Sequence, residues 1–507
     1  MSEPADRVSE PVDIVGPFTA WTDRESLAEQ MIPLVGALYR RRNVVTTIHG
    51  RRLPGRSAND LLKLHRFARH LDGVELDPSE IAPVLEGLTR LDLGPAVIDL
   101  ADLNERFRAQ EEQGLDDFLR RELAEVVGVG AFAVPPTDVV LFGFGRIGRL
   151  LARILVSRAG GASGLRLRAI VVRGSGSDDI VKRASLLRRD SVHGPFDGTI
   201  VVDEAAQTIT ANGTVIALVH ADDPGQVDYA SLGISDAILV DNTGKWRDRV
   251  GLERHLLNRG IRRVLLTAPG KGDIPNVVHG VNTNDIGDEA IVAAASCTTN
   301  AVTPVLAAID EEFGVEHGHI ETVHSFTNDQ NLTDNFHPEG RRGRSAVLNL
   351  VLAETGAAKA VAKAYPALAG KLTGNAIRVP TPDVSIAVLT LRLERPVTRD
   401  ELNSFLRGVS LRSGLHRQVD YVDSPEIVSS DQLGARKAGV VDGRATIADG
   451  TPSVVVYVWY DNEYGYSRQV VRVLESMTGV RISSYPARVP SAPQPRGLLS
   501  AAGSAPS

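Results

Sequence analysis

The one cysteine of this chain, Cys297, lies in the segment A-S-C-T-T-N (295–300), directly before an apolar run over 301–313 that has the character of a helix. Ser296 is a residue type that caps helices, so we predict that Cys297 stands in the first turn of that helix. There the helix dipole and nearby backbone amides should lower the pKa of the thiol and increase its thiolate fraction. Cys297 is therefore a candidate nucleophile.

A nucleophilic thiol needs a base, and His324 opens the polar run H-S-F-T-N-D-Q (324–330). A histidine in such a run is more often structural when it is judged alone, so its pairing with Cys297 is a hypothesis. A second hypothesis, of a different class, is a redox-sensing or binding protein in which Cys297 reacts with oxidants. An activated thiolate is chemically suited to that reaction as well.

A glycine-rich turn, G-F-G-R-I-G (143–148), follows an apolar run over 137–142 and precedes a helix-like stretch over 147–158. Glycines at these positions permit a tight turn and let the backbone approach a pyrophosphate, while the helix N-terminus supplies amide donors and a favourable dipole. We therefore predict a dinucleotide site that includes Gly143, Gly145 and Gly148.

The end of the second strand, expected over 165–172, normally selects between the two nicotinamide cofactors. NAD enzymes carry a carboxylate there, whereas this chain has Arg173. A guanidinium can pair with the 2′-phosphate of NADP, which a carboxylate would repel. We predict that NADP is favoured over NAD, although Asp178 and Asp179 follow closely and could still bind a ribose.

The elements that must position these residues alternate between strand and helix from Thr137 onward, which predicts an α/β fold with a Rossmann-type dinucleotide-binding domain over 135–296. Beyond Asn300 the apolar runs lengthen and alternate, which predicts an α+β catalytic domain with an antiparallel sheet over 297–462. A C-terminal helix over 463–484 is expected to return to the cofactor domain.

A helical N-terminal extension is predicted over 19–134. Leu27, Met31, Leu34, Val35 and Leu38 fall on one helix face, and helix caps are expected at Ser57 and Asp77, with a further helix around 114–127. The extension carries no chemical motif, so its role is left open. It could be a docking module, an oligomerisation module, a lid or a stabilising layer. Residues 1–18 and 485–507 are expected to be disordered, because they are rich in proline and polar residues.

Composition narrows the class of protein. The 507 residues carry a net charge of −7, which argues against a polybasic nucleic-acid binder. No apolar run is long enough for a membrane span, and the first residues lack the character of a signal or transit peptide. With one cysteine, neither an intrachain disulfide nor a thiolate metal cluster can form. We expect a cytoplasmic protein with no metal and no nucleic-acid or membrane partner.

Six spaced motifs together resemble the glyceraldehyde-3-phosphate dehydrogenase family in their order, over about 137–480. A seventh segment, D-S-V-H-G (190–194), is similar too. The six motifs are G-F-G-R-I-G-R (143–149), A-S-C-T-T-N (295–300), H-S-F-T-N-D-Q (324–330), T-G-A-A-K-A-V (355–361), G-K-L-T-G-N-A-I-R-V-P-T-P-D-V-S (370–385) and W-Y-D-N-E-Y-G-Y-S (459–467).

The resemblance implies a homotetrameric, phosphorylating enzyme of glycolysis or gluconeogenesis. Cys297 would attack the aldehyde of glyceraldehyde 3-phosphate, with His324 as base, and the resulting thioester would react with inorganic phosphate to give an acyl phosphate. Two sets of binding residues are also implied. Those for the two phosphates are Ser296, Thr298, Thr327, Thr355, Gly356 and Arg378, and the further cofactor residues are Arg146, Ile147, Thr243, Thr267 and Asn462.

Several positions depart from the family pattern. Phe142 stands where an Asn usually precedes the glycine turn, and Arg173 replaces the usual Asp. Asn331, Asn335 and Phe336 change a loop that normally meets the cofactor of a neighbouring subunit, although the basic cluster over 341–344 is kept. None of these changes touches the cysteine and histidine. A sister enzyme, erythrose-4-phosphate dehydrogenase, would show the same pair and remains an alternative.

Overall fold

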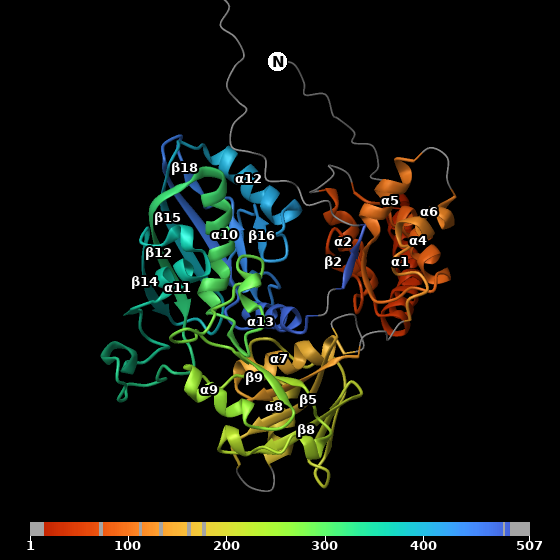
Figure 1. Cartoon of the computed structure of the whole chain (residues 1–507). Coiled ribbons are helices and arrows are strands. Elements are labelled where there is room, and N and C mark those ends of the chain that lie inside the picture. The colour runs from red at the N-terminus through yellow and green to blue at the C-terminus, as the bar shows by residue number, and fades with distance from the viewer. Residues whose placement is uncertain are drawn as a thin grey trace, which may run out of the picture. The chain divides into compact units, whose positions relative to one another are not determined.

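The computed structural model describes residues 15–69, 75–110, 114–130, 135–159, 164–174, 179–479 and 482–486. The chain forms two compact units (Figure 1). The N-terminal unit comprises Met1–Ala133 and Ile482–Ser507, and the large unit comprises Val134–Arg481. Each unit has its own buried hydrophobic core.

The N-terminal unit contains the expected helices, but its description as helical is incomplete. Ser57 caps one helix by accepting a hydrogen bond from the amide of Asp60, and Asp77 caps another by accepting from Ser79. The first helix already begins at Val15, so the prediction of disorder is wrong for residues 15–18. The helices are α1 (Val15–Arg42), α2 (Ala58–Phe67), α4 (Pro78–Arg90), α5 (Leu100–Arg108) and α6 (Leu115–Glu122).

The same unit also holds a four-stranded sheet in the order β2-β1-β3-β20. Its first strand, β1 (Val44–Ile48), is buried along its whole length, so it lacks the polar alternation that marks a half-exposed strand. The other strands are β2 (Arg51–Arg52), β3 (Ala96–Asp99) and β20 (Ser483–Tyr485). These short runs between helices carry no periodic signal, which explains why the sequence pattern missed them.

The strand β20 comes from the far end of the chain and pairs with β3 in parallel. Tyr485 is buried, and its hydroxyl donates to Oε2 of Glu125 at 2.9 Å. The predicted C-terminal tail therefore begins too early at residue 485, and residues 487–507 lie outside the described residues. Both ends of the chain build this unit.

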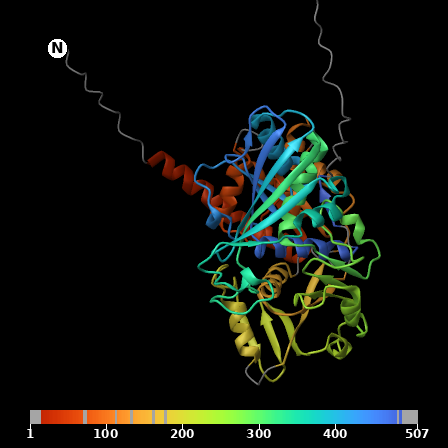
Figure 2. The same cartoon turned by 90° about the vertical axis from the view of Figure 1, so that its left-hand side faces the viewer.

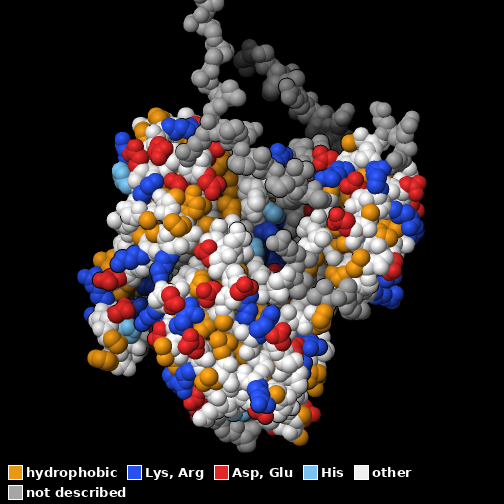
Figure 3. Space-filling view, viewed as in Figure 1, with side chains coloured by type: hydrophobic (Ala, Val, Ile, Leu, Met, Phe, Trp, Pro, Cys, Tyr) orange, Lys and Arg blue, Asp and Glu red, His pale blue; other side chains and the backbone are white. Residues whose placement is uncertain are grey.

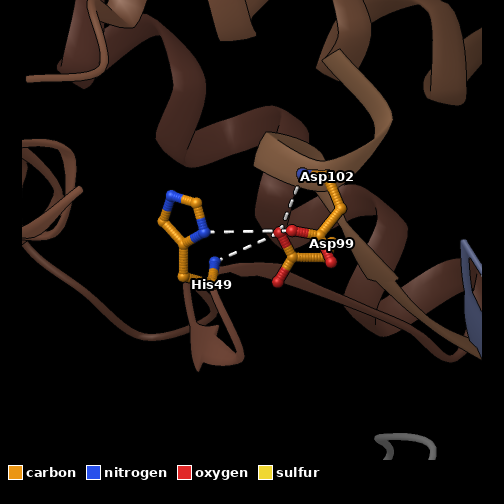
Figure 4. Close-up of side chains that lie close together, drawn as sticks. All are labelled: His49, Asp99 and Asp102. Atoms are coloured by element: carbon orange, nitrogen blue, oxygen red, sulfur yellow. Dashed lines mark hydrogen bonds and ion pairs between the residues drawn. The ribbon is translucent and has the colours of Figure 1, made fainter. Parts of the chain in front are cut away.

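Asp99, at the end of β3, connects a tight hairpin to the helix that follows it, because it accepts from the backbone amides of His49 and Asp102 (Figure 4). His49 and Gly50 connect β1 to β2 with φ values of +45° and +75°, as a two-residue turn of the mirror-image type requires. The Asp99 carboxylate accepts from the amides of His49 at 3.1 Å and Gly50 at 2.6 Å, and from the amide of Ala101 at 3.2 Å at the start of α5. Since both oxygens already accept hydrogen bonds, this carboxylate acts as a structural anchor.

We expect Asp99→Ala to destabilise the N-terminal unit by about 2 to 4 kcal/mol, because it removes a helix cap and leaves buried amides unsatisfied. Asp99→Asn, which keeps one oxygen acceptor, should cost less. Hydrogen exchange of residues 44–52 followed by mass spectrometry measures the change. Equal protection of this segment in the wild type and Asp99→Ala would contradict the anchoring role.

The first half of the large unit is a doubly wound sheet in the order β11-β10-β9-β4-β5-β8-β7-β6, which confirms the Rossmann-type fold. Its central strand, β4, is buried from Asp138 onward and is therefore apolar through Val139–Phe142. The strands are β4 (Thr137–Phe142), β5 (Leu165–Val172), β6 (Ile200–Asp203), β7 (Thr208–Ala211), β8 (Thr214–His220), β9 (Ala237–Asp241), β10 (Ile261–Leu266) and β11 (Ile291–Ala293), with helices α7 (Arg146–Ser157), α8 (Asp179–Arg188) and α9 (Arg249–Leu256).

The second half is a mixed sheet in the order β13-β14-β12-β15-β19-β17-β16, whose long strands lie side by side in Figure 2. Most neighbours are antiparallel, as predicted, but β12 pairs with β14, and β16 with β17, in parallel. The strands are β12 (Val315–Ser325), β13 (Val351–Ala353), β14 (Leu372–Val379), β15 (Ser385–Leu393), β16 (Val419–Val422), β17 (Gly439–Asp442), β18 (Ile447–Ala448) and β19 (Ser453–Tyr460), with helices α10 (Cys297–Phe313), α11 (Ala357–Ala364) and α12 (Arg399–Arg412).

The last helix, α13 (Tyr464–Met477), packs against α7, so it joins the core of the dinucleotide half. In the described part of the chain, no helix is both long and apolar enough to cross a membrane. Lys and Arg side chains are interspersed with Asp and Glu over the visible face of the large unit (Figure 3). This mixture fits the small net charge and offers no extended basic face in this view.

Candidate active site

Cys297 is the first residue of α10, and Ser296 caps that helix by accepting from the amide of Thr299 at 3.1 Å. His324 lies near the end of β12 and is buried. The packing of α10 on the second sheet brings Sγ of Cys297 to 3.4 Å from Nε2 of His324. The two residues are 27 positions apart in sequence, yet their reactive atoms are in contact.

The contacts at Nδ1 of His324 favour one tautomer. Nδ1 lies 2.7 Å from the carbonyl oxygen of Ser325, to which it donates when it carries the proton. Nη1 of Arg378 lies 2.9 Å from the same nitrogen and can only donate, but it also reaches the Ser325 carbonyl oxygen at 3.2 Å. We assign the proton to Nδ1, because that is the shorter contact, and Nε2 is then the acceptor that faces the thiol. Burial, together with the nearby Arg378 guanidinium, lowers the pKa of His324 to about 3. The imidazole is therefore neutral near pH 7 and can take a proton.

The pKa of the Cys297 thiol differs from the value that its position at the helix N-terminus suggested. Burial raises the pKa of Cys297, although Arg378 and hydrogen bonds around Thr298 act in the opposite direction. The expectation of a lowered pKa is therefore wrong, because desolvation outweighs the helix terminus. A thiol with a raised pKa is mostly protonated near neutral pH, so chemistry through its thiolate needs a neighbouring base, and Nε2 of His324 is the nitrogen in contact with the sulfur.

Arg378 reaches the pair from β14, where it lies directly beside His324 in the parallel register of β12 and β14. Its Nη1 lies 2.9 Å from Nδ1 of His324 and donates to the carbonyl oxygen of Ser325 at 3.2 Å. Thr327 follows the end of β12 by two residues, and its hydroxyl donates to the carboxylate of Asp329. A cation and a hydroxyl at this point can bind an anionic group of a substrate.

The other hydroxyls predicted for phosphate binding fall into two places. Thr298 is buried on α10, and its Oγ1 lies 3.0 Å from the hydroxyl of Tyr460. Thr355 and Gly356 stand at the start of α11, and Thr355 lines a pocket of about 450 Å³ together with Arg341. Glu354 lines the same pocket, although no sequence motif predicted a role for this residue.

Asn462 lies between β19 and α13 and is buried. Its Oδ1 accepts from the hydroxyls of Ser325 and Ser385, both at 2.9 Å. Because its oxygen is held in this way, the amide NH₂ is the end that can donate to a carboxamide. Ser325 follows His324 directly, so the end of β12 carries both His324 and a hydrogen-bond partner of Asn462.

The glycine turn fits a dinucleotide. Gly143 has φ of +101°, and a Cβ on Gly148 would lie 2.4 Å from the carbonyl oxygen of Gly143, so neither position accepts a side chain. A Cβ on Gly145 would meet no atom, so the turn is open on that side. Gly145 is the N-cap of α7 and provides no side-chain hydrogen bond, which leaves the helix N-terminus accessible to an anion. Glycines at positions where a side chain would clash or would block the helix N-terminus are typical of a turn that binds a pyrophosphate.

The other residues predicted to contact the cofactor lie on neighbouring elements of this half. Thr243 and Thr267 follow the neighbouring strands β9 and β10, and both hydrogen-bond Asp241. Ile147 packs against the core. The guanidinium of Arg146 is engaged in ion pairs with Asp190 and Glu463, so only its backbone remains for a cofactor contact.

Arg173 is exposed directly after β5, at the carboxyl end of the parallel strands. Asp179, the alternative ribose acceptor, is already bonded: its Oδ2 accepts from Nε of Arg183 at 2.5 Å and lies 3.0 Å from Nε2 of His220. Asp178 lies outside the described residues. Asp179 is therefore held by these two partners, and Arg173 is an exposed cation at this strand end.

The departures from the family pattern have structural counterparts. Phe142 is buried, and its ring meets those of His255 at 4.8 Å and Trp246 at 5.9 Å, so an aromatic cluster takes the place of a polar contact. Asn331 donates to the carbonyl of Asn335 at 3.1 Å, and Phe336 is 87% exposed. Hydrophobic side chains gather at the end of this projecting loop in Figure 3.

Comparison with known proteins defines the class. The domain described as "Glyceraldehyde 3-phosphate dehydrogenase, NAD binding domain" matches residues 137–249, and the C-terminal domain of that family matches residues 296–462. The chain therefore belongs to the glyceraldehyde-3-phosphate dehydrogenase family. It is an oxidoreductase with a domain for a nicotinamide dinucleotide.

Among its relatives is a glyceraldehyde-3-phosphate dehydrogenase-like protein of Pseudomonas aeruginosa (strain UCBPP-PA14), 58% identical over 461 residues, which cover 90% of this chain and 100% of that protein. The glyceraldehyde-3-phosphate dehydrogenase of Zymomonas mobilis is 39% identical, covering 67% of this chain and 98% of that protein. A chloroplastic glyceraldehyde-3-phosphate dehydrogenase A of Zea mays is 40% identical, covering 70% and 88%. The Pseudomonas match is too long to be confined to the large unit, so it includes part of the N-terminal unit.

Proposed function

We propose that this protein is a phosphorylating glyceraldehyde-3-phosphate dehydrogenase that forms an acyl phosphate through a thioester on Cys297. The observation that carries the proposal is the 3.4 Å contact between the thiol and a buried, neutral His324. Arg378 beside this pair supplies a cation for a phosphorylated substrate. A nucleophile, a base and an anion site thus meet at one place.

The reaction follows from these groups. His324 takes the proton of the thiol, the sulfur forms a bond to the aldehyde carbon, and the imidazolium returns this proton to the aldehyde oxygen. A bound nicotinamide would supply the acceptor for the hydride of this carbon. His324 takes the hydroxyl proton as that hydride leaves, and a thioester on Cys297 remains. An oxygen of inorganic phosphate attacks the thioester carbon, the carbon–sulfur bond breaks, and the acyl phosphate departs from the regenerated thiolate.

The binding roles are assigned as the resemblance implies. Thr327 and Arg378 bind the phosphate of the substrate, and Ser296, Thr298, Thr355 and Gly356 bind the attacking phosphate. Asn462 holds the nicotinamide carboxamide, supported by the two serine hydroxyls that fix its oxygen. The glycine turn and α7 bind the pyrophosphate, with Thr243 and Thr267 beside it.

We also propose that NADP is preferred to NAD. If Arg173 binds the 2′-phosphate, Arg173→Asp should lower the ratio of kcat/KM for NADP to that for NAD by about tenfold or more, because a favourable ion pair becomes a repulsion. Initial rates with each cofactor measure the ratio. Arg189→Asp, a charge reversal outside the proposed cofactor site, is the control, and an unchanged ratio in Arg173→Asp would remove Arg173 as the selector.

A homotetramer is the proposed assembly, as is usual in the family. The loop over 331–350 supports it, because Phe336, Leu348 and Leu350 are 87%, 81% and 72% exposed. Apolar side chains at this exposure are suited to burial against a second copy of the chain. Sedimentation velocity would show the assembly.

The deciding experiment compares initial rates with glyceraldehyde 3-phosphate, with and without inorganic phosphate, using NADP and NAD. Phosphate-dependent turnover is expected, faster with NADP. Phosphate-independent turnover with erythrose 4-phosphate and none with the triose phosphate would favour the sister enzyme. No turnover with either substrate would overturn the proposed reaction and favour a redox-sensing or binding role.

A further inference from the structure

His193 is a buried histidine of the large unit that the proposed chemistry does not use. Its side chain is 6% exposed, and Nε2 lies 3.3 Å from Oδ2 of Asp383 and 3.2 Å from Oε2 of Glu463. The three residues come from segments far apart in the sequence: the loop after α8, the turn before β15, and the start of α13. One imidazole therefore joins the two halves of the large unit.

The Glu463 carboxylate extends this connection to the glycine turn. It accepts from Nε of Arg146 at 2.9 Å, and Arg146, the first residue of α7, also bonds Asp190 at 2.5 Å. Asp190 in turn accepts from the backbone amide of His193 at 3.0 Å. The loop that carries His193 and the turn that cradles the cofactor are thus held by one closed set of bonds.

Asn462 lies between two residues of the same network. The neighbouring Asp461 accepts from the amides of Glu463 at 3.0 Å and Tyr464 at 2.6 Å, which fixes the entry to α13. On the opposite side, Asp383 leads into Val384, whose φ of +65° is rare for a β-branched residue, and then into Ser385, which bonds Asn462. The backbone on both sides of Asn462 and its partner Ser385 is therefore held by carboxylates that surround His193.

The charges explain why a histidine is needed here. The side chains of Asp383 and Asp461 are buried, and the pKa of Asp461 is raised by burial and by the charge of Asp383. Burial would lower the pKa of His193, but Asp383, Glu463 and Asp461 raise it to about 9. The pKa of Glu463 is lowered, since His193 and Arg146 offset its burial. Without a cation at this position, buried carboxylates would face each other uncompensated.

Building on the proposed role of Asn462, we propose that His193 is a positioning residue that, as an imidazolium, fixes Asn462 and the glycine turn in one arrangement for the nicotinamide cofactor. It acts through Glu463 and Asp383 and does not touch the reacting atoms. Its loss should weaken cofactor binding while leaving the Cys297–His324 pair in place.

The test is direct binding of NADP and NAD to the full-length protein, measured by calorimetry, for the wild type and His193→Gln. We expect a cofactor Kd that is higher by about tenfold, and a kcat at saturating cofactor within about threefold of the wild type. His193→Gln/Asp383→Asn removes the carboxylate that has lost its cation, and should recover most of the affinity. His317→Gln, an exposed histidine on β12, is the control and should bind as the wild type does.

The pH dependence of the cofactor Kd distinguishes a positioning role of His193 from a general effect of His193 on the stability of the protein. Because the pKa of His193 is raised to about 9, its imidazolium contributes fully to cofactor binding below about pH 6.5. This contribution is lost as the pH rises through about 9. The Kd of the wild type should therefore rise across pH 8–10 more steeply than that of His193→Gln. Glu463→Gln should weaken binding in the same direction.

Three outcomes would overturn the inference: an unchanged Kd in His193→Gln, no recovery in the double variant, or the same pH profile in the wild type and His193→Gln. Binding is measured without substrate, so the result does not depend on the aldehyde that the enzyme oxidises. If the wild type binds cofactor and turns over no triose phosphate, the proposed reaction fails while the role of His193 is still decided by the Kd values.

Discussion

Replacing Cys297 with serine is expected to abolish oxidation, with kcat reduced by at least about 10⁴-fold. A serine hydroxyl is a far weaker nucleophile than a thiol, and its proton is much less acidic, so transfer of that proton to His324 is far less favourable. Cofactor binding should remain close to that of the wild type, because the glycine turn lies on other elements. Phosphate-dependent reduction of the cofactor and its direct binding measure the two effects.

Mass spectrometry after mixing with substrate and cofactor, without phosphate, should find an acyl group on the wild type and none on Cys297→Ser. Thr303→Ser keeps a hydroxyl on the same helix and should turn over normally. Undiminished turnover in Cys297→Ser would contradict the proposed mechanism. Loss of cofactor binding in that variant would instead show that the substitution disturbs more than the nucleophile.

The second large effect is expected for His324→Asn, which should lower the rate of acylation by about 10² to 10⁴-fold. In this variant the thiol must ionise without a neighbouring base, and burial holds its pKa above the usual value. The remaining activity should therefore rise about tenfold for each pH unit through the neutral range, where thiolate is the minor form. The wild type should show a flatter profile, since the neutral imidazole accepts the proton throughout this range.

The rate of alkylation of Cys297 by iodoacetamide, followed against pH in both proteins, measures thiolate formation apart from hydride transfer. His317→Gln is the matched histidine control. Equal pH profiles in the wild type and His324→Asn would show that His324 does not accept the thiol proton.

Local sequence determined the parts of this protein that depend on neighbours along the chain. The glycine turn between β4 and α7, the cap at Ser296 and the caps at Ser57 and Asp77 could each be predicted, because turn and cap chemistry act over a few residues. The order of the motifs also predicted the family and the α/β fold.

Tertiary structure alone decided the rest. The short buried strands β1 and β3 have no periodic pattern, and β20 reaches their sheet from the other end of the chain. The pKa of Cys297 is raised because burial, which no local pattern reveals, outweighs the helix terminus. His193 meets Asp383 and Glu463 only because two sheets and α13 fold together. Desolvation and long-range ion pairs depend on which distant segments pack against each other, and this packing is specified only in the folded chain.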